Sequence, residues 1–367
     1  MSDTISSMLL IGIGGAGCAM ARNITHAFGE NLRYVLTDTD AKTGEYDGPF
    51  VLIGGDRLSG RGSGGDVVAA RLAAEDSVQA LDDSLEGIRL AIIVTSLGGG
   101  TGGGATLETI KHLSERGIPS CVFATTPFAF EGETRQRNAR GMMTLIEEAA
   151  SACFFIPLDK VVGDPESDMP TAMRRAVETV ASGVTLFWRL VEKPGYIRLD
   201  AERVRHLVAG AGRGRFAHVS AHGEGRAAKI VDDIRRSSIL LAGSGPVTSI
   251  LCGVLAGDDL RLSEIGTISD GIRETFGDKA SFELATVNDD LTFSGRISVI
   301  VMLFESTHQE TEEPKGSEQA RRRRKQRAIL SAGPTGRGRF NNSEPTIWNG
   351  EDLDTPTFLR KNISLEF

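Results

Sequence analysis

Seven residues, GGGTGGG at 98–104, constrain the fold of this chain more than any other stretch. They follow an apolar run at 91–94 that is typical of a buried strand, and they precede a pattern at 107–116 that predicts an amphipathic helix. Glycine lets backbone N–H groups approach a ligand closely, and the first turn of a helix presents unpaired N–H groups beside the positive end of its dipole. The order of strand, glycine-rich loop and helix therefore predicts a phosphate-binding site. No Gly-Lys-Ser/Thr triplet follows, which excludes a phosphate-binding loop of the Walker A type. A flexible loop or a tight crossover remains the alternative interpretation of the glycine-rich segment.

The first 160 residues alternate between strand-like and helix-like patterns, which predicts an α/β fold with a parallel, doubly wound sheet. In such a sheet the ligand lies at the carboxyl ends of the strands. Most of the strand-like runs end in Gly, Asp or Pro, so we expect their ends to form one crevice. These runs are 8–13, 34–37, 51–53, 91–96, 120–126 and 152–156.

The remaining chain divides by composition. Apolar residues in steps of three and four over 171–193 predict a helix of about 34 Å at 1.5 Å per residue, which ends at Pro194-Gly195. Strand-like runs and one helix pattern then predict a smaller α+β domain, and a polar, charged stretch follows that cannot bury enough apolar surface to fold. The expected parts are a nucleotide-binding domain at 1–170, a central helix at 171–195, the α+β domain at 196–305, a disordered linker at 306–350 and a terminal peptide at 351–367.

Composition excludes several classes of protein. With 40% hydrophobic and 25% charged residues the chain resembles a soluble globular protein, and no apolar run approaches the 18 residues of a membrane span. The first residues lack the basic flank of a signal peptide, so a cytoplasmic location is expected. Four widely spaced cysteines show no metal-binding spacing and are interpreted as buried small residues.

Charge is distributed unevenly along the chain. The formal net charge is −8, yet the tail from residue 306 carries 11 Lys+Arg and 9 Asp+Glu, a net charge of +2, so the first 305 residues carry a net charge of −10. An acidic body argues against broad nucleic-acid binding. The basic run at 321–325 is interpreted as a solvated part of the linker, with contact to anionic lipid headgroups as the alternative.

A series of motifs resembles the FtsZ family of bacterial cell-division proteins, in the tubulin superfamily, over nearly the whole chain. The glycine-rich segment followed about 25 residues later by PFAFEG is the most specific part, and the terminal motif favours FtsZ over tubulin. The motifs are GIGGAG at 12–17, DTDA at 38–41, GRGSGGD at 60–66, GGGTGGG at 98–104, PFAFEG at 127–132, IPLDK at 156–160, KPG at 193–195 and LDTPTFLRK at 353–361.

The resemblance implies a function and partners. The first domain is expected to bind GTP or GDP, with Mg²⁺ accompanying the nucleotide, and subunits are expected to stack head to tail into the filament of a division ring. A loop of one subunit then completes GTP hydrolysis on the neighbouring subunit's nucleotide. The terminal peptide is expected to bind membrane-tethering division adaptors at the division site through Asp354, Pro356, Phe358 and Leu359; a stray apolar tail is the alternative.

The resemblance also implies the residues that contact the nucleotide. Backbone N–H groups from several loops hold the phosphate oxygens without a Lys. In the first loop the phosphates are expected to contact Gly14, Gly15, Ala16, Gly17 and Cys18. Ser63 and Gly64 belong to the loop that senses the γ-phosphate, and the glycine-rich segment contributes Gly99, Gly100, Thr101 and Gly102. Glu131 and Arg135 align with contacts to the ribose and the phosphates.

The positions that contact the base depart from the family pattern. FtsZ usually has Asn at the positions of Ala19 and Leu158, an aromatic residue at that of Met173 and Asp at that of Glu178. Glu178 keeps a carboxylate that can accept hydrogen bonds from guanine, whereas both amides are lost, each worth about 1 kcal/mol net. We therefore expect weaker or less selective guanine binding than in the family.

The expected catalytic loop at 198–203 departs further. Asp200 is retained, with capping of the following helix as a second role, but Arg198 replaces an Asn and Arg203 replaces a second Asp. Glu202 does not substitute, because it lies about 100° around the helix from position 203. The arginines either stabilise phosphate charge as an arginine finger does, or strengthen the interface while hydrolysis slows. We favour slow hydrolysis, and we expect Arg203→Asp to raise turnover.

Two other functions stay open on the sequence alone. The spacing Gly12-x-Gly14-x-x-Gly17 after a strand, with Asp38 about 20 residues further on, also fits an NAD-dependent oxidoreductase. The second glycine-rich segment and the absence of a plausible catalytic His, Lys and Tyr set argue against it. The altered loop at 198–203 also fits a filament-forming paralogue that binds nucleotide and scarcely hydrolyses it.

Overall fold

The computed structural model describes residues 7–28, 32–45, 48–162, 166–193, 195–199, 201–209, 211–243, 245–277, 279–305, 347–348 and 351–352. The chain forms two compact units, Met1–Thr307 and His308–Phe367. In the second unit the described residues form an antiparallel pair, β11 (Ile347–Trp348) and β12 (Glu351–Asp352). Asp354, Pro356, Phe358, Leu359 and the basic run at 321–325 lie outside the described residues.

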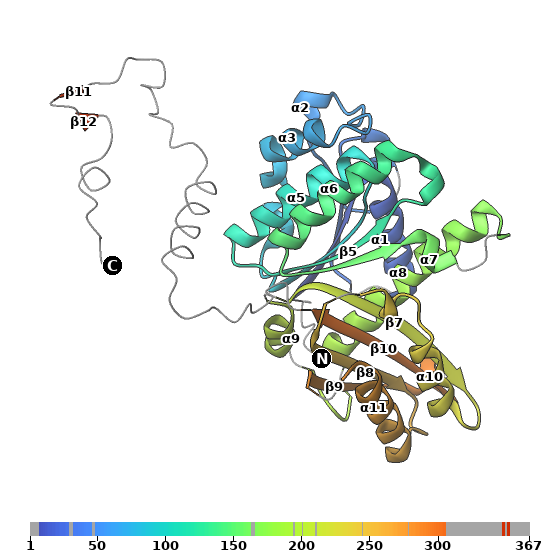
Figure 1. Ribbon diagram of the computed structural model, residues 1–367. Helices are drawn as coiled ribbons and strands as arrows, with labels where there is room; N and C mark the ends of the chain where they lie inside the picture. Colours follow the sequence, from blue (N-terminus) through green and yellow to red (C-terminus); the bar gives the residue numbers. More distant parts are fainter. Residues whose placement is uncertain are drawn as a thin grey trace. The chain divides into compact units, whose positions relative to one another are not determined.

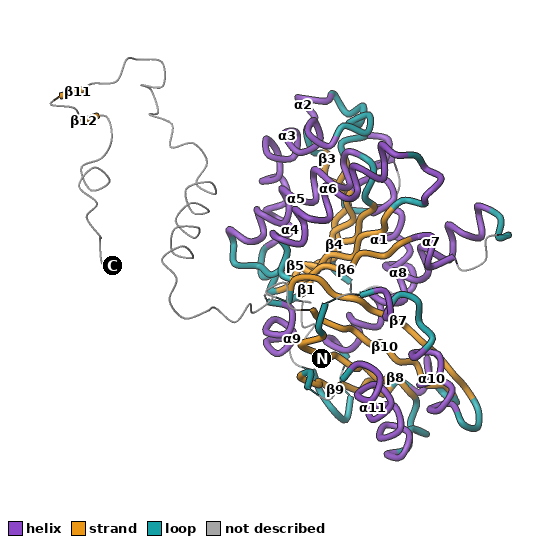
Figure 2. Tube along the Cα trace, in the orientation of Figure 1, coloured by secondary structure: helices purple, strands orange, loops and turns teal. Residues whose placement is uncertain are grey.

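The first unit is built on one ten-stranded sheet of order β3-β2-β1-β4-β5-β6-β7-β10-β8-β9 (Figure 2). The first six strands pair in parallel, as the alternating pattern predicts. The α/β class with a doubly wound first part is therefore confirmed. These strands are β1 (Met8–Ile13), β2 (Tyr34–Asp38), β3 (Phe50–Leu52), β4 (Leu90–Ser96), β5 (Ser120–Thr126) and β6 (Ala152–Pro157).

Both faces of this parallel sheet are covered by helices (Figure 1). Along β1, Leu10 belongs to the apolar cluster shared with α1 and α8, while Leu9 and Ile11 belong to the cluster shared with α3, α5 and α6. Burial on both faces explains why the strands are continuous apolar runs. The helices are α1 (Gly14–Phe28), α2 (Gly55–Leu58), α3 (Val67–Ser77), α4 (Asp82–Leu85), α5 (Gly100–Glu115), α6 (Glu133–Ala149) and α7 (Leu158–Val162).

The helix predicted at 107–116 begins earlier, at Gly100, so most of the GGGTGGG glycines are helical. Close packing against neighbouring backbone explains them. A Cβ at Gly102 would lie 2.0 Å from the carbonyl oxygen of Ser96, and one at Gly104 would lie 2.4 Å from that of Val67. The segment is therefore a tightly packed helix start, and its glycines are required by close approach more than by flexibility.

The long helix α8 (Met169–Glu192) spans 24 residues and corresponds to the helix predicted at 171–193. Its N-cap residue Asp168 accepts a hydrogen bond of 2.8 Å from the N–H of Thr171. Its buried side includes Phe187 and Trp188, and Gly183 leaves room for the ring of Phe216. The helix is therefore built into the core between the two parts of the first unit.

The second part of this unit, residues 195–305, combines four strands with four helices among its described residues. Antiparallel pairing of β10 with β7 and β8 confirms its α+β character. Its sheet is continuous with the first, because β6 pairs with β7. The elements are α9 (Ala201–Val208), β7 (Gly212–His222), α10 (Arg226–Arg235), β8 (Val247–Ala256), α11 (Leu262–Phe276), β9 (Ser281–Asn288), α12 (Asp290–Phe293) and β10 (Arg296–Glu305).

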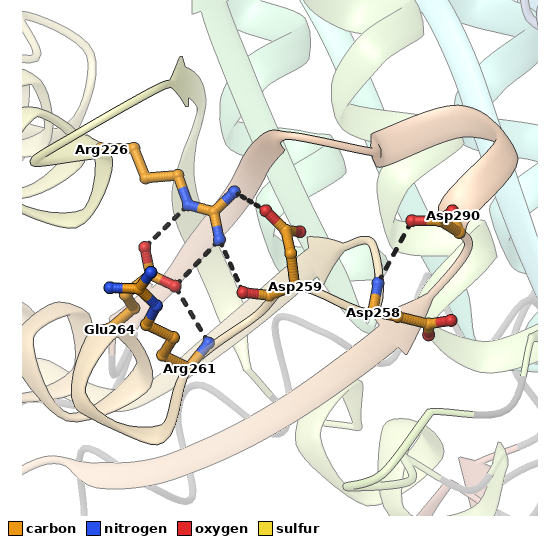
Figure 3. Close-up of polar contacts among 6 residues, drawn as sticks. All are labelled: Arg226, Asp258, Asp259, Arg261, Glu264 and Asp290. Carbon is orange, nitrogen blue, oxygen red and sulfur yellow. Dashed lines mark hydrogen bonds and ion pairs between the residues drawn. The ribbon is translucent and has the colours of Figure 1, made fainter.

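An ion-pair network joins the starts of α10 and α11 (Figure 3). Arg226, with 6% of its side chain exposed, donates to both carboxylate oxygens of Glu264 at 2.7 and 2.9 Å. It also donates to the carboxylate and the carbonyl oxygen of Asp259. The loop between β8 and α11 is thereby fixed to the neighbouring helix.

The described helices include none that combines the length and the apolar character of a membrane span. No group of three or more His, Cys, Asp or Glu side chains in the described part is arranged to hold a metal ion.

Candidate functional site

A cavity of about 480 Å³ lies where β1, β2 and β4 end and α1 and α5 begin. Its lining comes from residues within 13–17, 38–43, 62–65 and 96–102, and from Arg135. The expectation that several strand ends form one crevice is therefore met by the geometry. The sequence-predicted residues that line it are Gly14, Gly15, Ala16, Gly17, Ser63, Gly99, Gly100, Thr101, Gly102 and Arg135.

The two glycine-rich segments meet inside this cavity. A Cβ at Gly14 would lie 3.3 Å from the backbone nitrogen of Gly102, and one at Gly17 would lie 2.5 Å from the carbonyl oxygen of Val94. Gly14 also has a φ of +75°, which a residue with a side chain rarely adopts. The starts of α1 and α5 therefore lie side by side and turn their first N–H groups toward one hollow.

A chain of hydroxyl groups holds the segments together. Thr101, 8% exposed, places its Oγ1 2.6 Å from Thr39 Oγ1 and 3.3 Å from Ser63 Oγ. Thr95 Oγ1 shares its one proton between the carbonyl oxygens of Gly102 and Ile13, which lie at 2.9 and 3.1 Å. These bonds fix the cavity floor with neutral groups. Sequence reasoning missed Thr39, although its position in DTDA at a strand end was a signal.

Two carboxylates, Asp38 and Asp40, also line the cavity. Asp38 is 4% exposed and accepts from the N–H of Thr39 at 2.7 Å and from Thr43 Oγ1 at 2.7 Å. Sequence reasoning did not assign either as a contact of GTP, although both belong to the DTDA motif, and it used Asp38 only in the NAD alternative. Carboxylate oxygens here suit a hard cation such as Mg²⁺, which prefers oxygen ligands, or hydroxyl groups of a ligand.

Arg135 is the one cation among the described residues of the lining. Its Nη1 lies 2.8 Å from Glu131 Oε2, and Glu131 Oε1 accepts from the N–H of Phe128 at 2.8 Å. Glu131 itself is not part of the lining. The cavity is therefore dominated by backbone donors and hydroxyls, which suits an anionic ligand bound without a lysine.

Comparison with known families decides the identity of this part of the chain. Residues 7–163 match the model of the Tubulin/FtsZ family, GTPase domain. This region is a Tubulin/FtsZ family GTPase domain. The dinucleotide-type glycine spacing thus occurs within a GTPase domain.

Solved structures with a similar fold extend over most of the chain. A point mutant of FtsZ from M. jannaschii shares 23% identity at a TM-score of 0.75 and covers 82% of this chain and 91% of its own. An empty FtsZ dimer from M. jannaschii shares 22% identity at a TM-score of 0.76, and the match covers 86% of this chain and 96% of that chain. A GTPγS-bound protofilament of CetZ2 from Haloferax volcanii shares 21% identity at a TM-score of 0.68, and the match covers 89% of this chain and 99% of that chain. At these identities the comparison establishes the fold.

Other predicted residues of the GTPase domain lie outside the cavity lining. Cys18 is buried, and its thiol contacts the carbonyl oxygens of Gly12 and Thr37 at 3.4 and 3.5 Å. Burial, followed by the charge of Asp38, raises the pKa of Cys18 to about 12, so the thiol stays neutral. Only its backbone remains available to a phosphate. Ala19 and Gly64 are exposed and also lie outside the lining.

The expected base contacts lie near α8 and also outside the lining. Glu178 is exposed and lines two other hollows, both of which also include Ser182 of α8 and His218 of β7. Leu158 is buried beside Phe128 and Ala172, whereas Met173 is 41% exposed. Their contact with guanine stays a prediction.

The expected catalytic loop, residues 198–203, runs from the segment after α8 into the first turn of α9. Arg198 is exposed, between Ile197, which is hydrogen-bonded to Thr286, and the buried Leu199. Asp200 lies outside the described residues. Arg203 forms an ion pair with Glu283 of β9, a partner 80 positions away that no local pattern could indicate.

Proposed function

We propose that this protein binds GTP and GDP in the cavity and assembles head to tail into filaments that hydrolyse GTP slowly at the subunit interface. The observation that carries the proposal is the convergence of Gly14–Gly17 and Gly99–Gly102 on one hollow. The family match supports the choice of nucleotide. The description of one similar structure as a dimer and of another as a protofilament supports self-association.

Each part of the lining has a role in this proposal. The N–H groups at the starts of α1 and α5 bind phosphate oxygens, and both helix dipoles favour the negative charge. Ser63 of the lining, with Gly64 next to it in the same loop but outside the lining, is assigned to the side of the γ-phosphate, and Arg135 adds a positive charge. Mg²⁺ accompanies the nucleotide and neutralises phosphate charge, and the carboxylates of Asp38 and Asp40 are the lining groups suited to it.

Base recognition is the weakest part of the proposed site. Glu178 offers one carboxylate, while Ala19 and Leu158 offer no side-chain hydrogen bond. We infer reduced selectivity for guanine. Binding of GTP at least a hundredfold tighter than ATP by the purified protein would contradict this inference.

The cellular role that we propose is bacterial cell division, with the terminal peptide binding membrane-tethering adaptors. It rests on the LDTPTFLRK motif at 353–361. Deletion of 351–367 is expected to leave filament formation intact and to abolish adaptor binding. Adaptor binding that is unchanged after the deletion would contradict this role.

The deciding experiment combines sedimentation with phosphate release in GTP, GDP and ATP. We expect GTP-dependent pelleting with slow phosphate release. Pelleting without detectable release would favour the second candidate, a filament-forming paralogue that does not hydrolyse GTP, for which the arginines of the 198–203 loop are the supporting observation. The absence of both GTP binding and pelleting would overturn the proposed function.

A further inference from the structure

One of the two hollows lined by Glu178 lies apart from the cavity proposed to bind nucleotide. It has a volume of about 480 Å³ and lies where α7 and α8 meet β7, α10 and the residues directly after α10 (Figure 1). We call it the α7–α10 hollow. Helix α7 belongs to the matched GTPase domain, whereas β7 and α10 belong to the part at 195–305. The described linings of the hollow and the cavity share no residue, so a ligand of the hollow would contact both parts without occupying the cavity.

Three cations from three segments line the α7–α10 hollow. Lys160 belongs to α7 and Arg175 to α8, and Arg236 directly follows α10. All three side chains are exposed, and none forms an ion pair with a described residue. A single cation of this kind on a convex surface is usually only solvated. Three cations on the wall of one hollow instead form a site with a net attraction for an anion.

Hydrogen bonds hold the segments that carry these cations. Arg175 Nη1 donates to the carbonyl oxygen of Val162 at 3.0 Å and to Ser167 Oγ at 3.2 Å, which ties the end of α7 to α8. Ser238 Oγ donates to the carbonyl oxygen of Lys160 at 3.4 Å, which ties α7 to the segment after α10. The hollow is therefore formed before any ligand binds, as small-molecule sites usually are.

The other polar groups of the lining indicate what accompanies the anion. Two carboxylates, Glu178 and Asp233, line the hollow, and neither pairs with a described cation. Glu178 also lines the neighbouring hollow, so Asp233 is the carboxylate that belongs to this one alone. His218 adds no charge at neutral pH, because burial lowers its pKa to about 4. A carboxylate repels a phosphate but accepts hydrogen bonds from hydroxyl groups. The hydroxyls of the lining are those of Thr179, Ser182, Ser237 and Ser238.

We propose that the α7–α10 hollow binds a phosphorylated sugar. Lys160, Arg175 and Arg236 bind the phosphate, since the guanidinium fork fits phosphate oxygens and an ammonium adds a compact charge. Asp233 accepts hydrogen bonds from the sugar hydroxyls. The volume of about 480 Å³ suits a ligand of this size and exceeds what a free phosphate would fill. This site goes beyond the proposed function and does not depend on it.

The test is calorimetric titration of the full chain, kept saturated with GDP, with three probes: glucose 6-phosphate, inorganic phosphate and glucose. We expect glucose 6-phosphate to bind more tightly than inorganic phosphate, and glucose not to bind. Lys160→Gln and Arg236→Gln should each weaken the binding of both phosphate probes about tenfold or more, because each removes a charge-assisted hydrogen bond. Asp233→Ala should weaken glucose 6-phosphate alone and leave inorganic phosphate no weaker.

The same helix supplies matched controls. Lys229 and Asp232 of α10 are exposed and lie outside the lining, so Lys229→Gln and Asp232→Ala should bind all probes as the wild type does. The side chains of Lys160 and Arg236 make no hydrogen bond or ion pair with described residues. Their variants should therefore unfold in urea as the wild type does, and a loss of binding then reports on the hollow itself.

Three outcomes would overturn the proposal. The first is no binding of either phosphate probe up to about 10 mM, which is weaker than a specific site should be. The second is binding that neither Lys160→Gln nor Arg236→Gln weakens, which would place the probe at another site. The third is equal affinity for glucose 6-phosphate and inorganic phosphate, which would remove the sugar from the ligand class. GDP affinity is measured on the same protein, so failure of GDP to bind would count against the proposed function alone.

Discussion

The candidate cavity and the loops of the second part are stabilised by different chemistry. Around the cavity, hydroxyls such as Thr101 and Thr95 and closely packed glycines such as Gly102 hold the loops. In the second part, Arg226 binds Asp259 and Glu264, and Asp289 binds Arg189 of α8 and Lys193, the residue after that helix. The loops around the cavity are held by neutral groups, which leaves backbone N–H groups available to an anion, whereas the loops of the second part are held by ion pairs.

The largest difference between the two regions should follow from adding one methyl group at the cavity. Gly102→Ala places a Cβ 2.0 Å from the carbonyl oxygen of Ser96, which as backbone cannot rotate away. We expect a loss of about 3 kcal/mol or more in the free energy of unfolding, together with loss of bound nucleotide. Urea denaturation and analysis of the nucleotide retained by the purified protein measure both effects.

A matched glycine provides the control for this substitution. Gly141 of α6 has no heavy atom within 4 Å of its Cβ position. Gly141→Ala should raise the free energy of unfolding by about 0.5–1 kcal/mol through helix propensity and leave nucleotide binding unchanged. Wild-type nucleotide retention in Gly102→Ala would contradict the close packing described for this cavity.

An intermediate loss of stability is expected when the ion-pair network around Arg226 in the second part is broken. Hydrogen bonds from Arg226 hold the pKa of Glu264 below its ordinary value, so the network persists at neutral pH and weakens only as acid protonates that carboxylate. Arg226→Met leaves Glu264, 18% exposed, without its partner and should cost about 2–3 kcal/mol in urea denaturation. Nucleotide affinity should not change, because none of these residues lines the cavity.

The control is an exposed ion pair of the same two helices. Arg235 and Glu274 are 45% and 69% exposed, so Arg235→Met should cost about 0.5 kcal/mol or less. If the two variants lost equal stability, burial of Arg226 would not be the source of its effect.

The same comparison separates what the sequence could predict from what it could not. The parallel strands could be predicted from apolar runs that alternate with helical patterns. The position of the cavity could be predicted because these runs end in glycine or Asp and because ligands of such sheets bind at the carboxyl ends of the strands. The start of α5 at Gly100 was missed because glycine disfavours helices, and only packing against Ser96 reverses that preference. The Arg203–Glu283 pair was missed because its members lie 80 positions apart, so only the folded sheet joins them.

The smallest expected effect is a change of stability with pH that depends on His218 of β7, a titratable group in the second part. Burial, and then the charge of Arg296, lowers its pKa from the ordinary 6.5 to about 4. Between these values the unfolded chain binds a proton that the folded protein does not, so stability is full above pH 6.5 and falls as the pH drops toward 4. From pH 7 to pH 5 the loss should be about 1–2 kcal/mol.

His218→Gln tests this assignment, because glutamine keeps a polar side chain beside Ser220 and does not titrate. Urea denaturation at pH 7 and pH 5 should show most of the wild-type loss removed in this variant. His222→Gln, at an exposed position of the same strand, should retain the full loss. Glu264 does not account for a loss in this window, since its pKa lies below the ordinary 4.5. A pH dependence unchanged in His218→Gln would therefore show that His218 is not the titrating group.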